Sequence, residues 1–184
     1  AAVILLQSEE LLADPPLSEE QKEQLEAIRR KARDMSSMIS QLLLLSRADQ
    51  GRQALQKESL DISELTQMTA EEQQLLAQER HISIETDIEP GIVMEADESF
   101  FIRLLVNLIS NSISYGREGG TTKVSLRREG KMAVLAVADN GQGIEEKDLP
   151  RIWDRFYRAD ASRSDAGHSG LGLSIVKHGA KFHH

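Results

Sequence analysis

The chain has 184 residues, of which 40% are hydrophobic, so it is long enough to bury one good core with a smaller unit beside it. Its formal net charge of −8 argues against a nucleic-acid partner, and the absence of cysteine excludes disulfides, thiolate metal sites and cysteine nucleophiles. No apolar run approaches the roughly 20 residues of a membrane span, so we expect no membrane contact from these residues.

The first 49 residues are predicted to form an antiparallel helical hairpin. The stretch "AAVILLQSEELLA" favours a helix that ends at Pro15 and Pro16, because proline cannot continue the hydrogen-bond ladder. Ser18 is the expected N-cap of a long second helix, and Gln21 completes a capping box. Apolar or small residues then recur in steps of three and four: Leu25, Ile28, Ala32, Met35, Ile39, Leu42 and Ser46. Since two helices bury little area alone, this seam predicts a homodimer that forms a four-helix bundle.

After residue 50 the pattern changes to strands mixed with helices. Strands are expected within residues 54–62, 82–88 and 92–97, and a hairpin over 121–139 that turns at Glu129 and Gly130. Helices are expected over 63–81 with Ser63 as its cap, over an apolar stretch that Asp97 or Ser99 caps and Gly116 ends, and over 171–182. Residues 149–160 are expected to be helical or irregular, and a polar loop follows them.

Two asparagines stand on the apolar helix. Asn107 and Asn111 are four residues apart and so share one face, which Tyr115 extends. Amides on an apolar surface cost free energy unless they are hydrogen-bonded. They are therefore either a satisfied buried pair or groups that bind a ligand.

The stretch "DNGQGI" follows the last expected strand. Asp139 offers a carboxylate that can accept a hydrogen bond from an amino group such as adenine N6. Gly141 and Gly143 lack a side chain, so the backbone can turn sharply and approach a flat ring. An ordinary turn is the competing interpretation.

A second pair of glycines, Gly170 and Gly172, opens the last expected helix. Free N–H groups and the positive end of the helix dipole at such a terminus suit a phosphate, although a plain N-terminal turn has the same residues. The polar loop before it, residues 158 to 169, is predicted to be a mobile lid.

Together these stretches resemble the N, G1 and G2 boxes of sensor histidine kinases, and "RIWDRFYRAD" resembles their F box. The resemblance implies an α+β chain, in which the hairpin precedes an α/β sandwich of the Bergerat type with helices on one face of a mixed sheet. It implies a dimerisation and phosphotransfer hairpin at residues 1–49, a linker at 50–57 and an ATP-binding domain at 58–184.

The resemblance also implies that ATP and Mg²⁺ are the cofactors, with the metal held by Asn111. The residues that it assigns to the nucleotide are Asn107, Asn111, Tyr115, Asp139, Gly141, Gly143, Ile144, Gly170, Leu171, Gly172 and Leu173. Ser114 stands where the family usually has a basic residue, so Arg155 and Arg158 are further candidates for a phosphate contact. His168 replaces a glycine of many members and is either another phosphate contact or a solvated loop residue.

In the family the phosphoacceptor histidine belongs to a motif like "H-E-L-R-T-P", which would end just before Ala1. None of the five histidines lies within residues 1–49. We therefore expect a fragment with no catalytic residue of its own that cannot autophosphorylate and that lacks the family's last two strands. In the intact protein, the γ-phosphoryl would pass to that histidine and then to a response regulator, and the intact protein would be anchored in a bacterial inner membrane with this portion in the cytoplasm.

Two alternatives share the ATP-binding architecture. Gyrase, MutL and the large heat-shock chaperones hydrolyse ATP with a glutamate four residues before the metal-binding asparagine, where this chain has Asn107. An amide cannot accept a proton at neutral pH, so hydrolysis is disfavoured. A non-catalytic binding module such as an anti-sigma factor would lack the long hairpin.

Overall fold

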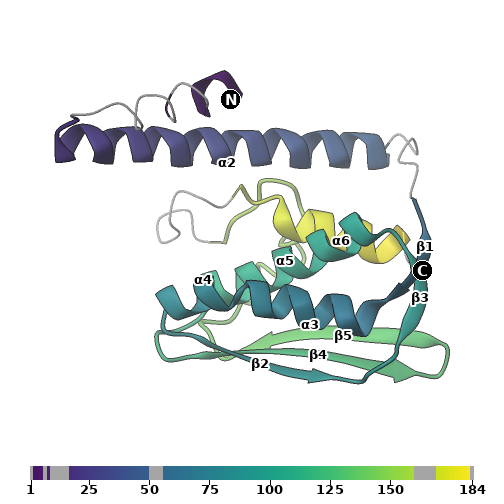
Figure 1. Ribbon diagram of the computed structural model, residues 1–184. Coiled ribbons are helices and arrows are strands. Elements are labelled where there is room, and N and C mark those ends of the chain that lie inside the picture. The colour runs from purple at the N-terminus through teal and green to yellow at the C-terminus, as the bar shows by residue number, and fades with distance from the viewer. Residues whose placement is uncertain (1, 6–7, 9–16, 50–55, 160–168, 183–184) are drawn as a thin grey trace. The chain divides into compact units, whose positions relative to one another are not determined.

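Figure 1 shows the computed structural model of the chain, which describes residues 2–5, 8, 17–49, 56–159 and 169–182. The chain divides into two compact units, Ala1–Gln53 and Ala54–His184. The described residues of the first unit are mainly helical, and those of the second unit form the sheets and several further helices. None of the helices in the described ranges has the length and hydropathy needed to cross a bilayer.

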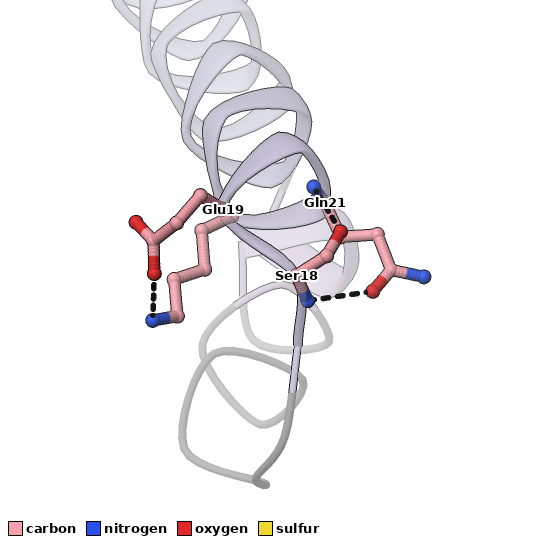
Figure 2. Close-up of polar contacts among 4 residues, drawn as sticks. Ser18, Glu19 and Gln21 are labelled. Atoms are coloured by element: carbon pink, nitrogen blue, oxygen red, sulfur yellow. Dashed lines mark hydrogen bonds and ion pairs between the residues drawn. The ribbon is translucent and has the colours of Figure 1, made fainter.

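The long helix of the first unit, α2 (Glu19–Asp49), begins with the predicted capping box. The backbone N–H of Gln21 donates to Ser18 Oγ at 3.2 Å, and the N–H of Ser18 donates to Gln21 Oε1 at 2.9 Å (Figure 2). These two bonds satisfy N–H groups that have no partner within the helix, which is why the helix begins here. Residues 2–5 and 8 are also helical, while the predicted end of that helix at Pro15 and Pro16 lies outside the described residues.

The second unit has two sheets. The smaller sheet pairs β1 (Glu58–Asp61) with β3 (Val93–Ala96) in antiparallel fashion. The larger has the order β2-β4-β5 and consists of β2 (Ser83–Ile88), β4 (Thr121–Glu129) and β5 (Met132–Asp139). Because β2 runs parallel and β5 antiparallel to β4, the sheet is mixed, as predicted.

The helices of this unit are α3 (Ile62–Glu72), α4 (Gln74–Glu79), α5 (Glu98–Tyr115) and α6 (Gly172–Phe182). They lie on one face of the three-stranded sheet (Figure 1). Alternate residues of β4 point toward them, so Val124 and Leu126 are fully buried, as are Ile109 and Ile113 of α5. Burial of these apolar side chains holds α5 against the sheet.

The predicted cap of α3 is wrong. The helix begins after Asp61, whose Oδ1 accepts hydrogen bonds from the N–H groups of Ser63 and Glu64. Ser63 instead bonds through its hydroxyl to the loop before β3, since it donates to the Glu89 carbonyl at 2.6 Å and accepts from the Ile92 N–H at 3.0 Å. The single helix predicted over 63–81 is two helices, because α3 ends before Gln73 and α4 follows it.

Other element ends follow the prediction more closely. Asp97 caps α5 by accepting the Phe100 N–H at 3.0 Å. The hairpin turns one residue later than predicted, because Glu129 already pairs with Met132 and Gly130 takes a positive φ of 63°. A glycine adopts that backbone conformation without steric cost. Residues 146–156 form successive turns and bends rather than a regular helix.

Candidate functional site

The row of polar side chains on α5 faces the start of α6. The amide nitrogen of Asn107 donates to the Arg103 carbonyl at 2.7 Å, so this half of the amide is satisfied within the helix. The amide oxygen of Asn107 lies against Gly172. A Cβ added to Gly172 would be 2.8 Å from Asn107 Oδ1 and 3.7 Å from Asn111 Nδ2. A side chain at position 172 would displace the Asn107 amide, so the glycine lets α6 begin directly beside these two half-buried asparagines.

Asp139 ends β5 on the side of the sheet that faces the helices. Its partner in the register is the buried Thr122, and its side chain projects from the same face as that of Val137. Asp139 is itself exposed, and its Oδ1 accepts the Gly141 N–H at 2.9 Å. This carboxylate stands at the end of the β5 residues that face the helices. It can therefore contact both the turn and a ligand that lies over the turn.

The turn after Asp139 packs against the end of α5. A Cβ on Gly141 would clash with the Tyr115 carbonyl oxygen, and the Gln142 N–H donates to the same oxygen at 3.3 Å. Gly143 has a φ of +73°, and a Cβ added to it would meet no atom within 4 Å. The neighbouring Ile144 is 49% exposed. The turn thus leaves an apolar, accessible side chain beside a backbone that carries no side chain.

The start of α6 carries the second pair of glycines. Gly170 has a φ of +68°, and its carbonyl accepts the Phe156 N–H at 2.9 Å. The Leu171 side chain is fully buried, so only the backbone of this residue could face a ligand. Its N–H donates to Ser169 Oγ at 3.3 Å. Leu173 is half-buried.

The segment before α6 contains a contact that the sequence analysis missed. The Tyr157 hydroxyl donates to Asp148 Oδ1 at 2.7 Å, and the guanidinium carbon of Arg151 lies 4.2 Å from the centre of the Tyr157 ring. The hydrogen bond to Asp148 is the main cause of a raised Tyr157 pKa, and burial of the hydroxyl raises this pKa further. Nothing in the local pattern distinguishes Asp148 from the solvated charges around it, so this contact had no signal in the sequence.

The candidates for a charged phosphate contact lie on the segment before α6. Arg155 and Arg158 are half-buried on the same segment. His168, with most of the predicted lid, lies outside the described residues. Within the described parts of the chain, no three His, Cys, Asp or Glu side chains gather as a metal site. A cation at this place would therefore depend on amide oxygens, ligand phosphates and water, which is the kind of site that Mg²⁺ accepts.

The structure thus brings the turn after Asp139 and the start of α6 against one helix. α5 contacts the turn that follows Asp139 through the Tyr115 carbonyl, and it contacts the start of α6 through Asn107. Both groups of glycines are consequently fixed relative to the same rigid element.

Two family models match the chain. Residues 2–51 match the His Kinase A (phospho-acceptor) domain, and residues 96–184 match the histidine kinase-, DNA gyrase B- and HSP90-like ATPase domain. Two solved structures share the fold. One is full-length ShkA in complex with AMPPNP, with a TM-score of 0.79 and 24% identity over 97% of this chain and 37% of that one. The other is the mycobacterial sensor histidine kinase MprB, with a TM-score of 0.59 and 27% identity over 69% of this chain and 80% of that one.

Curated relatives agree with the family models. The sensor-like histidine kinase SenX3 of Mycobacterium bovis is 33% identical over 179 residues, which cover 97% of this chain and 44% of that protein. The sensor histidine kinase RppB of a Synechocystis species is 36% identical over 169 residues, 91% of this chain and 37% of that protein. The chain spans less than half the length of these relatives. It belongs to the sensor histidine kinases, as the HisKA and HATPase portion of a two-component system kinase.

Proposed function

We propose that residues 58–184 bind MgATP beside α5, between the turn after Asp139 and the start of α6. The observation that supports this most is the double contact of α5, through the Tyr115 carbonyl with Gly141 and through Asn107 with Gly172. A single helix that fixes two turns built around glycines can hold the two ends of one extended ligand.

The turn after Asp139 would bind the adenine. One oxygen of the exposed Asp139 carboxylate accepts a hydrogen bond from the Gly141 N–H. The carboxylate can also accept a hydrogen bond from the amino group of adenine. Gly141 and Gly143 leave room for the flat ring, and Ile144 and Tyr115 offer apolar surface for it.

The start of α6 would bind the phosphates. Gly170, Leu171 and Gly172 present backbone at the positive end of the helix dipole, with Leu173 in the first turn. Arg155, Arg158 and His168 are further candidates for a charged contact, which would compensate for Ser114 in the place of the family's usual basic residue.

Asn111 would hold the Mg²⁺ through its amide oxygen. Mg²⁺ commonly takes only one or two protein ligands and completes its shell with phosphate oxygens and water, which agrees with the lack of a carboxylate cluster in the described residues. When bound, the ion neutralises charge on the phosphates and orients them.

Asn107 favours transfer over hydrolysis. It stands where the ATP-hydrolysing relatives of this architecture have a glutamate base, and its amide nitrogen already donates to the Arg103 carbonyl. With no proton acceptor at that point, water is not activated there and the γ-phosphoryl remains available for a side chain. This disfavours the ATPase alternative, and the family match at residues 2–51 disfavours an isolated binding module.

The acceptor in the intact protein would be a histidine on the part of the hairpin that precedes residues 1–49. A linker at residues 50–57 would join the hairpin to the ATP-binding domain. Because residues 1–49 hold no histidine, the chain of 184 residues would not phosphorylate itself. A response regulator would receive the phosphoryl group next. The intact protein would be anchored in a bacterial inner membrane, with this portion in the cytoplasm.

The hairpin would also form the homodimer. Apolar side chains along α2 are about half exposed in the single chain: Ile28 at 49%, Met35 at 57%, Ile39 at 51% and Leu43 at 54%. Covering this stripe with a second copy would remove its apolar surface from water.

Replacing Asn111 with alanine is expected to weaken ATP binding about tenfold in the presence of Mg²⁺, because the metal ion loses its protein ligand. Without Mg²⁺ the variant should bind ATP as the original chain does. Titration calorimetry with MgCl₂ and with a chelator measures both cases, and Gln78→Ala on α4 is a matched amide control. Equal losses in the two conditions would rule out the metal assignment.

A further inference from the structure

We propose that Tyr157 and Asp148 are positioning residues for the phosphate side of the nucleotide site, because their hydrogen bond fixes the backbone that holds the start of α6. The inference rests on the proposed function, since it concerns the same site. Neither residue is expected to touch the nucleotide.

The contact is built into a rigid turn. Asp148 is only 7% exposed, and its carbonyl accepts the N–H groups of Arg151 and Ile152 at 2.8 and 3.1 Å. Its carboxylate accepts the Tyr157 hydroxyl at 2.7 Å, while Arg151 covers the Tyr157 ring. The position of Tyr157 is therefore set from both the hydroxyl and the ring face.

Tyr157 in turn holds a strained neighbour. Phe156 has a φ of +63°, a left-handed conformation that is uncommon for a bulky residue. This conformation costs free energy and persists only where the surroundings impose it. The Phe156 side chain is 57% exposed, so its own burial does not impose this conformation. The bond between Tyr157 and Asp148 anchors the residue directly after Phe156, and it contributes to the constraint together with the bond from the Phe156 N–H to the Gly170 carbonyl.

The strained residue contacts the start of α6 directly. The Phe156 N–H donates to the Gly170 carbonyl at 2.9 Å. A Cβ on Gly170 would lie 2.9 Å from the Phe156 carbonyl carbon and 3.0 Å from the Tyr157 backbone carbonyl oxygen. Two residues after Gly170, Gly172 packs on Asn107. A shift of Phe156 would therefore displace the glycine backbone proposed to bind phosphate.

The adenine end does not depend on this contact. Asp139 and Gly141 are held by the end of α5, through the Tyr115 carbonyl and the bond from the Gly141 N–H to Asp139. Loss of the Tyr157 hydroxyl should thus affect the phosphates of the nucleotide and spare its base. This difference separates a positioning role from general support of the fold.

The test compares ATP with AMP, each with Mg²⁺, on the 184-residue chain. Tyr157→Phe keeps the ring under Arg151 but loses the bond, and it should weaken ATP about tenfold while AMP changes less than about twofold. Asp148→Ala should behave in the same way, and Asp148→Asn, which keeps an acceptor oxygen, should restore part of the ATP affinity. Combining Tyr157→Phe with Asp148→Ala should add nothing to either change alone.

Asp154→Asn is the matched control, because Asp154 is an exposed carboxylate in the same segment, and it should leave both affinities unchanged. Unchanged ATP affinity in Tyr157→Phe would overturn the inference. So would equal losses for ATP and AMP together with a lower melting temperature, which would indicate a structural role only. If the original chain binds neither nucleotide, the proposed function itself fails.

Discussion

Asp139→Asn is expected to weaken the binding of ATP by about 1.5 to 3 kcal/mol, the usual worth of a hydrogen bond to a charged group. The asparagine can still accept the Gly141 N–H with its oxygen, so the turn should persist. Its other atom is then an NH₂ group, which meets the amino group of adenine as donor against donor. Titration calorimetry with ATP measures the loss.

Asp87→Asn is the matched control for this variant. Asp87 lies on the opposite face of the same sheet, where it bonds Arg127 at 2.7 Å in an exposed ion pair whose Arg127 hydrogen bond lowers the pKa of the Asp87 carboxyl. Exposed ion pairs contribute little to stability, so the variant should remain folded. Its ATP affinity should not change, because Asp87 lies away from the proposed site. An Asp139→Asn chain that binds ATP as tightly as the original would show that the carboxylate does not contact the base.

Ile39→Asp is expected to convert a dimer of the chain into monomers. Ile39 lies in the middle of the exposed apolar stripe on α2, and in a dimer two unpaired carboxylates would be buried close together. Burying an unpaired charge costs several kcal/mol, which is enough to dissociate a dimer of modest affinity. Sedimentation velocity over a range of concentrations measures the change.

Leu75→Asp provides the comparison for the dimer. Leu75 is 68% exposed on α4 of the second unit, so a carboxylate there should leave the dimer intact. ATP binding should survive in both variants, because neither residue belongs to the proposed site. An Ile39→Asp chain that remains dimeric would mean that the stripe on α2 is not the interface.

Local patterns predicted much of the fold. The capping box of Ser18 and Gln21 needs only residues three apart in one helix, and both of its hydrogen bonds are present. The start of α3 shows where such patterns stop being sufficient, because Asp61 and Ser63 are both good capping residues. Only the pairing of β1 and the loop that Ser63 bonds decide between them.

The candidate site was predictable in its residue types but not in all its contacts. Glycine pairs and an acid at the end of a strand are visible in the sequence, and so Asp139 and Gly172 could be named. The bond from Tyr157 to Asp148 and the left-handed Phe156 depend on how irregular turns fold, where no periodicity helps. Their effect on Gly170 could be recognised only from the structure.

Transfer of the γ-phosphoryl from labelled ATP tests the central proposal most directly. The chain of 184 residues should remain unlabelled, because none of its five histidines lies in the hairpin. A longer form that includes the expected "H-E-L-R-T-P" motif before Ala1 should acquire acid-labile, base-stable label, and Asp139→Asn should reduce it. Stoichiometric acid-labile label on the 184-residue chain, or release of inorganic phosphate by the longer form without any labelled protein, would contradict the proposal.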